Sequence, residues 1–327
     1  MHQYLILAFT ALAGWVLGAA SSVFAQPSYP SKPIRIIVPL VPGGSTNTIA
    51  RLVGEKLKDA LGQPVVVENR PGGNSVIGTE AVARSAPDGY TLLINSSTHT
   101  IIPFVESKLP YDVIRDFSAV ASLGRTRYVL LIHPSVPAKT LKEFIAFAKA
   151  HPGQLNFGSS GTASGSRLAG EVFNMLAGVR MQNIPYKGGG AVAADLIGGH
   201  IEVSFNSPTL ATPYIKAGRV RGVAIAGETR LAQLPEVPTF IEAGLPTYNE
   251  QAWYGMFAAA ATPKAIVDRI NAEIARMQAT ADVKEIFAKD GLDPFVTAPE
   301  QFAAFLREDT AKLTKLVKVS NIKFSAQ

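Results

Sequence analysis

The 327-residue chain contains no cysteine at any position. This absence excludes structural disulfides, and it excludes a lipid-modified cysteine at the start of a mature chain. A protein without disulfides has to be stabilised by its hydrophobic cores. Hydrophobic residues make up 47% of the sequence, which suffices for the cores of two ordinary domains.

The sequence also lacks any run of basic residues, although its formal net charge is +6. Lysine and arginine are scattered singly, and no aromatic residues are interleaved among them. Nucleic-acid-binding proteins concentrate positive charge on one face or stripe, so we expect no nucleic-acid partner. A modest positive excess remains compatible with the attraction of small anions.

Several catalytic and cofactor motifs are missing. The sequence has no glycine-lysine pair for a phosphate-binding P-loop and no Gly-x-Ser-x-Gly segment for a serine nucleophile. No two of the five histidines have the spacing of metal ligands, so we expect no metal and no cofactor. Gly188, Gly190 and Ala193 match a loose dinucleotide fingerprint, but their mid-chain position makes this match weak.

The N-terminal segment indicates export. Residues 5–20 form an unbroken run of apolar and small residues, and residues 23–25 form a small-x-small cleavage site. We predict a signal peptide over residues 1–25, a mature chain that begins at Gln26, and a location in the periplasm. Residues 1–4 contain no lysine or arginine, and an uncleaved membrane anchor is the alternative.

Hydrophobic periodicity predicts alternating strands and helices in the first part of the chain. In order, they are a strand at 34–38, a helix at 47–61, a strand at 65–67, a helix at 76–85 and a strand at 90–94. A β-α-β-α-β series of this kind predicts a parallel sheet with helices on both faces.

The pattern restarts after residue 128 and predicts a second α/β lobe. Strands are expected at 129–132, 155–157, 181–184, 201–205, 220–226 and 253–258, and helices at 140–150, 166–177, 192–197, 208–217, 263–278, 283–289 and 299–318. This order fits two lobes of the α/β class.

Clusters of glycine, serine and threonine fall between strand ends and helix starts. They occupy residues 42–47, 96–99, 158–166 and 185–190. The carboxyl ends of parallel strands are where α/β sheets bind ligands, and glycines let backbone N–H groups and helix N-termini approach an anion. We expect two such cradles, one in each lobe, to hold a carboxylate between them. The alternative for each loop is ordinary turn chemistry with a helix cap.

Nine sequence blocks carry a further signal. They are residues 36–39 (IIVP), 43–47 (GGSTN), 66–72 (VVENRPG), 87–93 (PDGYTLL), 109–112 (LPYD), 156–159 (NFGS), 185–189 (PYKGG), 195–199 (DLIGG) and 242–246 (EAGLP). In this order they resemble the substrate-receptor family of tripartite tricarboxylate transporters, also called Bug-type periplasmic binding proteins. The similarity covers essentially the whole chain after the N-terminal segment.

The resemblance implies a type II periplasmic-binding-protein fold, with two α/β lobes around a ligand cleft. Lobe one is expected to comprise residues 26–125 and 253–327, and lobe two residues 126–252. The implied function is that of a receptor, not an enzyme, that binds a small dicarboxylate or aromatic carboxylate. We expect a monomer that delivers its ligand to the membrane permease subunits of a tripartite transporter.

The resemblance also implies the ligand-binding residues. The first cradle is Gly43, Gly44, Ser45, Thr46 and Asn47, and the second cradle is Ser159, Gly161, Thr162, Ala163 and Ser164, with Thr98 and His99 lining the cleft and Arg167, Tyr186 and Asn206 beside it. Family members hold one ligand carboxylate through loop amides and ordered water, and they read its far end with variable residues.

Four positions depart from the pattern of that family. Asn47 and Asn206 stand where aspartate is usual, Arg167 replaces a histidine, and Ala163 replaces a glycine. Two lost carboxylates and one gained cation favour anionic ligands over ligands with an ammonium group. The alternative is that Asn47 only caps its helix and that Arg167 points to solvent.

Two other functions stay open. A secreted hydrolase would need Ser97 or Ser164, His99 and Asp195 within hydrogen-bonding reach of one another. A receptor of the same fold could instead signal to a sensor protein. The ligand itself is also open among aliphatic dicarboxylates, aromatic carboxylates and tricarboxylates.

Overall fold

The first sheet combines strands from both ends of the described chain. The computed structural model describes residues 29–320, and the predicted signal segment and Gln26 lie outside them. The strand order is β11-β4-β10-β3-β1-β2. The strands are β1 (Ile34–Val38), β2 (Val65–Asn69), β3 (Thr91–Ser96), β4 (Phe117–Arg127), β10 (Gln251–Ala259) and β11 (Leu292–Asp293).

Two hydrogen-bonding patterns meet in this sheet. Strand β1 is parallel to both β2 and β3, as the β-α-β-α-β prediction requires. Strand β10 is antiparallel to β3 and β4, and β11 is antiparallel to β4. The sheet is therefore mixed, and the parallel arrangement holds only for its first three strands.

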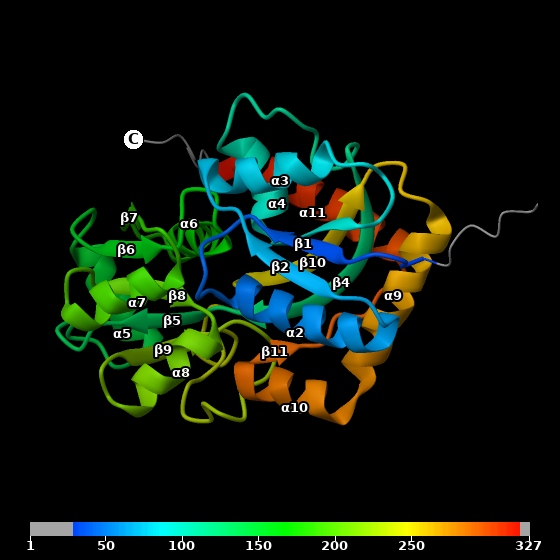
Figure 1. The fold of residues 1–327 in the computed structure, drawn as a ribbon. Coiled ribbons are helices and arrows are strands. Elements are labelled where there is room, and N and C mark those ends of the chain that lie inside the picture. The colour runs from blue at the N-terminus through cyan, green and yellow to red at the C-terminus, as the bar shows by residue number, and fades with distance from the viewer. Residues whose placement is uncertain (1–28, 321–327) are drawn as a thin grey trace, which may run out of the picture. The chain divides into compact units, whose positions relative to one another are not determined.

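Helices cover the first sheet on both faces. They are α2 (Ser45–Leu61), α3 (Val76–Ala83), α4 (Thr98–Ile101), α9 (Lys264–Ala279), α10 (Ala281–Asp290) and α11 (Pro299–Ser320), with short 3-10 turns η1 (Gly73–Ser75) and η2 (Ile102–Phe104). Figure 1 shows α2 on one side of the strands and α3 and α11 on the other. In α2, Ile49, Val53 and Leu57 recur at helical spacing and are buried, which is why periodicity located this helix.

The second sheet is built from one continuous stretch of chain, drawn in green in Figure 1. Its order is β7-β6-β8-β5-β9, with β6 parallel to β7 and β8, and β5 antiparallel to β8 and β9. The strands are β5 (Val129–Ile132), β6 (Asn156–Ser159), β7 (Gln182–Pro185), β8 (Val203–Asn206) and β9 (Arg221–Ile225), and the helices are α5 (Leu141–Ala150), α6 (Gly165–Ala177), α7 (Gly189–Gly198) and α8 (Pro208–Lys216).

Adjacent strands of the first sheet carry the chain out to the second sheet and back. Strand β4 leads into β5 after Tyr128, and β10 returns to pair with β4 from Arg127↔Gln251 to Phe117↔Ala259. The sequence prediction missed β4. From Lys32 onward the described chain belongs to one compact unit, and the lobe boundaries at 125/126 and 252/253 remain a prediction.

Aromatic side chains fill the core beneath the second sheet. Phe157, Phe173 and Phe205 are fully buried, and the Phe205 ring lies 6.3 Å from that of Phe157 and 5.6 Å from that of Phe173 by centroid. Each such side chain contributes roughly 1.5–3 kcal/mol through burial. Gly170 of α6 allows this approach, because a Cβ at that position would lie 2.2 Å from the Phe157 ring.

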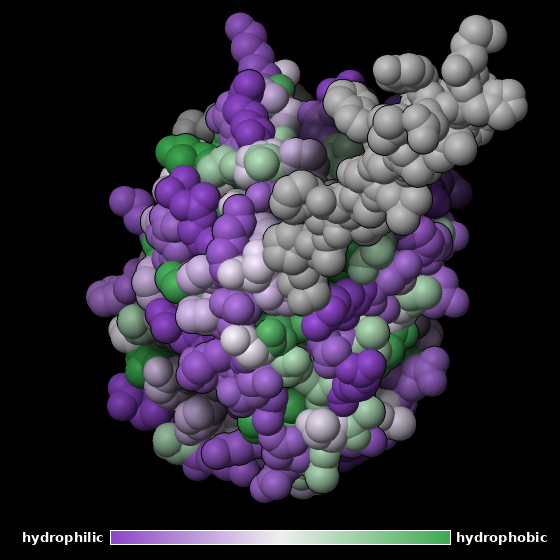
Figure 2. All heavy atoms as spheres, turned by 45° about the vertical axis from the view of Figure 1, so that its right-hand side comes forward, coloured by the Kyte–Doolittle hydropathy of each residue, from purple (hydrophilic) through white to green (hydrophobic). Residues whose placement is uncertain are grey.

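On the surface, large hydrophobic side chains are dispersed. Val66, Ile77, Met175 and Val296 are exposed at separate places along the chain. Figure 2 shows apolar residues interspersed among hydrophilic ones on the face in view. Between residues 29 and 320, no helix combines the length and apolar character that a membrane crossing requires.

Candidate ligand-binding site

The loops that follow six strands surround one cavity of about 690 Å³. Three of these strands, β1, β2 and β3, are parallel to one another in the first sheet, and β6, β7 and β8 are parallel in the second. Their carboxyl ends therefore all lead to the cavity, which is where open α/β sheets bind ligands. The volume lies within the range of small-molecule sites, about 300–1,000 Å³.

Three helices begin at the wall of this cavity. Helices α2, α7 and α8 have Gly44, Gly188 and Ser207 as their N-cap residues, and all three residues line the cavity. No side chain caps any of these three helices. The first backbone N–H groups of α2 and α7 and the positive ends of all three dipoles therefore face the cavity, an arrangement that favours an anion. Helix α8 begins with Pro208, which has no N–H, so its first residue offers no donor.

The cavity wall carries almost no formal charge. Lys187 is the single lysine or arginine that lines it, and no aspartate or glutamate does so among the described residues. A bound carboxylate would therefore meet backbone dipoles and hydroxyl groups without repulsion from a neighbouring carboxylate. The wall chemistry fits a small organic anion.

The first cradle presents its backbone to the cavity. Gly43 has a φ of +93°, a left-handed conformation that suits glycine, whereas Gly44 has an extended φ of −96°. Asn47 lies behind this loop, 7% exposed, and its Oδ1 accepts no hydrogen bond from the described residues. The structure thus places Asn47 within the first turn of α2 rather than on the cavity wall.

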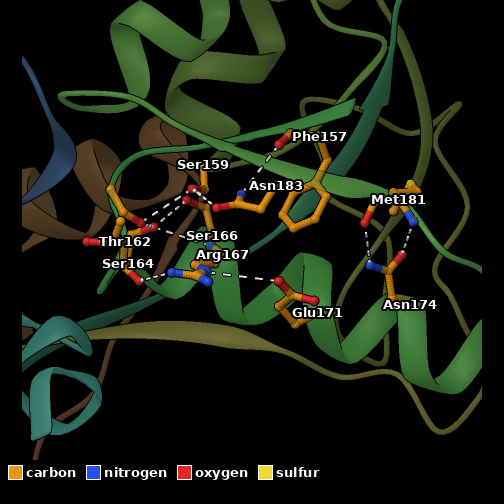
Figure 3. A network of polar contacts seen from close by, with 11 residues as sticks. Phe157, Ser159, Thr162, Ser164, Ser166, Arg167, Glu171, Asn174, Met181 and Asn183 are labelled. Atoms are coloured by element: carbon orange, nitrogen blue, oxygen red, sulfur yellow. Dashed lines mark hydrogen bonds and ion pairs between the residues drawn. The ribbon is translucent and has the colours of Figure 1, made fainter. Parts of the chain in front are cut away.

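The second cradle is held together by serine hydroxyl groups (Figure 3). The Ser160 backbone N–H donates to Ser166 Oγ over 2.9 Å, and Ser164 Oγ donates to the Gly161 carbonyl over 2.7 Å. Ser164 Oγ also accepts from the Arg167 backbone N–H at 3.2 Å and so caps α6. These bonds fix the shape of the loop beside the cavity.

Arg167 lies behind the second cradle and does not line the cavity. Its guanidinium donates to the Thr162 carbonyl over 3.1 Å and lies 3.9 Å from the Glu171 carboxylate, as Figure 3 shows for Glu171. Burial lowers the pKa of Arg167 and raises the pKa of Glu171. The expected cleft cation is therefore buried and paired, and the solvent-facing alternative is also wrong because the side chain is only 8% exposed.

Tyr186 and Asn206 both line the cavity. The Tyr186 hydroxyl donates to Asp195 Oδ2 over 2.7 Å, which orients the ring from outside the wall. Burial and the neighbouring Asp195 raise the pKa of Tyr186 to about 12, so this phenol stays protonated at neutral pH. Asn206 Nδ2 donates to Ser204 Oγ over 3.1 Å.

His99 lies in the core, away from the cavity. Its side chain is fully buried, its ring stacks on Phe257 at 4.2 Å, and Nε2 bonds to the Val113 carbonyl over 2.8 Å. Burial lowers the pKa of His99 to about 4, so the imidazole is neutral at physiological pH. The expectation that His99 lines the cleft does not match this position, because α4 turns the side chain inward.

The structure brings together ten of the fifteen residues expected at the site. Those that line the cavity are Gly43, Gly44, Ser45, Thr46, Thr98, Gly161, Ala163, Ser164, Tyr186 and Asn206, and those that do not are Asn47, His99, Ser159, Thr162 and Arg167. Ser159 is buried, and its single hydroxyl proton is shared between the Gly161 carbonyl at 3.3 Å and Asn183 Oδ1 at 3.2 Å.

Sequence reasoning missed several lining residues. Ser96 ends β3, and Lys187 and Gly188 lie between β7 and α7. The glycine and serine clusters that contain these residues were recognised, but the three residues were not assigned to the site. Tyr128 lines the cavity from the connection between β4 and β5, and Tyr254 lines it from within β10. Neither lies in a glycine- or serine-rich loop, so the sequence offered no such signal for them.

The residues of the hydrolase hypothesis are not assembled. His99 is bonded to a backbone carbonyl in the core, Asp195 accepts from Tyr186, and Ser164 donates to a carbonyl in its own loop. Nor do residues 29–320 contain a group of three or more histidine, aspartate or glutamate side chains arranged to hold a metal ion.

Two mixed α/β sheets with a cavity at their strand ends define the class of this protein as a two-lobed periplasmic solute-binding protein. Residues 49–322 match the family described as the tripartite tricarboxylate transporter family receptor, and the chain belongs to this family. Members of the family are periplasmic receptors that bind small carboxylates and work with transporter subunits.

Individual relatives are similar over nearly their whole length. Protein BugT of Bordetella pertussis is 34% identical over 325 residues, which cover 99% of each chain. A structure from R. palustris solved with adipate has a TM-score of 0.86 and 28% identity, and covers 91% of this chain and 100% of that one. MatC from Rhodopseudomonas palustris with bound malate has a TM-score of 0.82 and 32% identity, and covers 88% of this chain and all of that chain, 100%.

Proposed function

We propose that this protein is a periplasmic receptor that binds one small carboxylate and delivers it to the membrane subunits of a tripartite transporter. The observation that carries the proposal is the convergence of three helix N-termini without side-chain caps on a cavity whose wall, over the described residues, has one lysine and no carboxylate. Backbone donors of this kind bind an anion without proton transfer or covalent chemistry.

The ligand-binding residues of the proposal are those that line the cavity. Gly44 and Thr46 of the first cradle supply backbone donors at the start of α2, and the first turn of α7 after Gly188 supplies donors from the other sheet. Lobe boundaries near residues 125 and 252 would let the two sheets close over the ligand. Cleavage before Gln26 would release the receptor into the periplasm.

The proposal is supported by the ligands of two relatives. The R. palustris protein was solved with adipate and MatC with malate, both of which are dicarboxylates. A dicarboxylate or an aromatic carboxylate would place one carboxylate at the helix N-termini, and the rest of the 690 Å³ cavity would accept the body of the ligand.

A thermal-shift screen against a carboxylate library tests the proposal. A ligand present at about 100 times its Kd stabilises the folded state by about 2.7 kcal/mol, which is a clear shift in Tm. Matched amides of each hit serve as controls, because they lack the anion. If no carboxylate raises the Tm, or if the amides raise it equally, the proposed function is wrong.

A second experiment addresses delivery. Purified receptor loaded with its carboxylate should be captured by the membrane subunits of a tripartite transporter encoded near it. Capture by a sensor protein instead would support the signalling alternative, since both uses share this fold.

A further inference from the structure

One hydrogen bond joins loops that belong to different sheets. Thr162 Oγ1 donates to Asn74 Oδ1 over 2.7 Å. Asn74 lies in η1, which follows β2 of the first sheet, and Thr162 lies in the second cradle, which follows β6 of the second sheet. Asn74 lines the cavity and Thr162 does not, so the bond joins the loops of the two sheets at the rim of the cavity.

Both ends of this bond are held by further contacts. Asn74 Nδ2 donates to Glu106 Oε1 over 2.7 Å, which fixes the orientation of the amide so that Oδ1 faces Thr162. The Thr162 carbonyl accepts from the Arg167 guanidinium over 3.1 Å. A polar chain therefore runs from Glu106 in the first sheet's loops to Arg167 in α6.

The backbone around Asn74 is unusual for a residue with a side chain. Asn74 has a φ of +53° and Ser75 a φ of +82°, directly after Gly72 at +132° and Gly73 at +53°. Left-handed backbone is strained for residues other than glycine, although asparagine tolerates it better than most. Non-glycine residues in such conformations concentrate where the side chain has a function. At Asn74, the side chain makes the bond to the loop of the other sheet.

We propose that Asn74 is a positioning residue that fastens the two sides of the cavity together through Thr162 and so slows the release of ligand. The inference about release rests on the proposed function, whereas the fastening itself does not. A second contact across the cavity, Ser45 Oγ to Ser207 Oγ at 3.2 Å, joins the first cradle to the N-cap of α8. The Asn74–Thr162 bond therefore adds a separate fastening point on the η1 side.

Asn74→Gly is the first variant, because glycine suits the left-handed backbone and only the side-chain bonds to Thr162 and Glu106 are lost. We expect an unchanged or raised Tm together with a roughly three- to tenfold weaker Kd for the carboxylate found by screening, the change that loss of one hydrogen bond corresponds to. The loss should appear in the dissociation rate, measured by stopped-flow or surface plasmon resonance.

Variants of the partner make the test specific. Thr162→Val should weaken binding as Asn74→Gly does, Thr162→Ser should retain wild-type affinity, and the double variant Asn74→Gly with Thr162→Val should lose no more than either single one. Thr314→Val is the control, since it removes a hydroxyl bonded to Thr310 within one helix. If both single variants bind like wild type, or their losses add in full, the proposal is overturned.

Small-angle scattering of the protein without added ligand separates the two proposals. Loss of the fastening should shift the population toward a more open form, so the radius of gyration of Asn74→Gly and Thr162→Val should exceed that of wild type and of Thr314→Val. An unchanged radius in both variants contradicts the fastening. Failure of every carboxylate to bind wild type would instead contradict the proposed function and leave this scattering test intact.

Discussion

The two cradles border the same cavity but are held in shape by different means. The first cradle relies on glycine backbone and on α2, whose N-terminus has no side-chain cap. The second cradle relies on side chains, because Ser164 caps α6 and Ser166 accepts from the Ser160 backbone. One loop therefore offers backbone donors to a ligand, while hydroxyl groups in the other are engaged with their own loop.

The difference indicates a division of labour. The helix donors at the start of α2 gain most from an anion, because no side chain caps them in the described part of the chain. The hydrogen-bonded second cradle contributes a preformed wall, and preformed walls reduce the ordering cost of binding. Changes in the first cradle should therefore act mainly on affinity, and changes in the second on stability as well.

The largest effect on ligand binding is expected from Gly44→Val. The backbone of Gly44 is extended, and a Cβ there would meet nothing within 4 Å, so the fold should survive. The branched side chain would occupy the space in front of the α2 N-terminus. We expect an affinity loss of about 100-fold or more, equivalent to roughly 2.7 kcal/mol, with an unchanged Tm. Calorimetry and thermal unfolding measure the two quantities.

Gly165→Val is the matched change at the second cradle. A Cβ at Gly165 would lie 2.4 Å from the Tyr128 hydroxyl and 2.7 Å from Ser97 Oγ, so neighbouring groups must move. We expect this variant to lose about 1–3 kcal/mol of folding stability, unlike Gly44→Val. Equal Tm values for the two variants would contradict the proposed difference between the cradles.

Acid should lower the folding stability through His99, which is buried in α4 against the first sheet. The folded pKa is about 4 and the ordinary value 6.5, so the unfolded chain binds the proton more readily between these values. Stability should therefore fall as the pH drops from about 6.5 toward 4, by about 3 kcal/mol in total, and should be fully retained above 6.5. Urea unfolding of wild type and His99→Gln at several pH values isolates this contribution.

His200→Gln is the control for that experiment, because His200 is exposed. The free energy of unfolding of His200→Gln should change with pH as that of wild type does, because His99 and the carboxylates are the same in both proteins. A wild-type curve that coincides with His99→Gln would show that His99 is not linked to folding.

A smaller effect is expected at the hydroxyl network of the second cradle. Ser166→Ala leaves the Ser160 backbone N–H without its acceptor, which costs about 1–2 kcal/mol of stability. Ser85→Ala removes a hydroxyl bond to the Val82 carbonyl away from the cavity and serves as the control. If chemical denaturation finds Ser166→Ala as stable as wild type, the network does not hold the loop.

The smallest effect is expected from Asn47→Asp in the first cradle. A carboxylate in the first turn of α2 would compete with the ligand anion for the same helix terminus, and we expect a loss of about 1 kcal/mol for a dicarboxylate. An amino analogue should lose less, because the new aspartate would attract its ammonium group through the field of its charge. Calorimetry with both ligands measures the difference. Equal dicarboxylate affinity of wild type and variant would show that residue 47 serves the structure of α2 and does not influence the ligand.

Much of the fold could be predicted because its helices are amphipathic. The spacing of Ile49, Val53 and Leu57 located α2, and strand β5 was predicted at its observed bounds. Strand β4 was missed because Phe117–Arg127 mixes small, polar and basic residues without alternation. Its place beside β10 depends on pairing with a strand that lies far away in the sequence.

The site was predictable as a set of loops but not as a set of side chains. Glycine and serine clusters after strands identify the cavity wall, because strand ends and helix starts are local features. The direction of a side chain depends on tertiary packing. His99 and Arg167 both turn into the protein, the first onto Phe257 and the second toward Glu171, and nothing local to their sequence indicates this.

The central position of β10 has a consequence for the order of folding. Tyr254 of β10 pairs with Ser96 of β3, so the first sheet keeps two open strand edges until the chain has returned from the second sheet. The second sheet needs only Val129 to Ile225 and closes fewer long loops. We expect pulse-labelling hydrogen exchange to protect amides of β5–β9 before those of β10. In the interval, the edges of β3 and β4 are the places where a partly folded chain would pair with a second copy and aggregate.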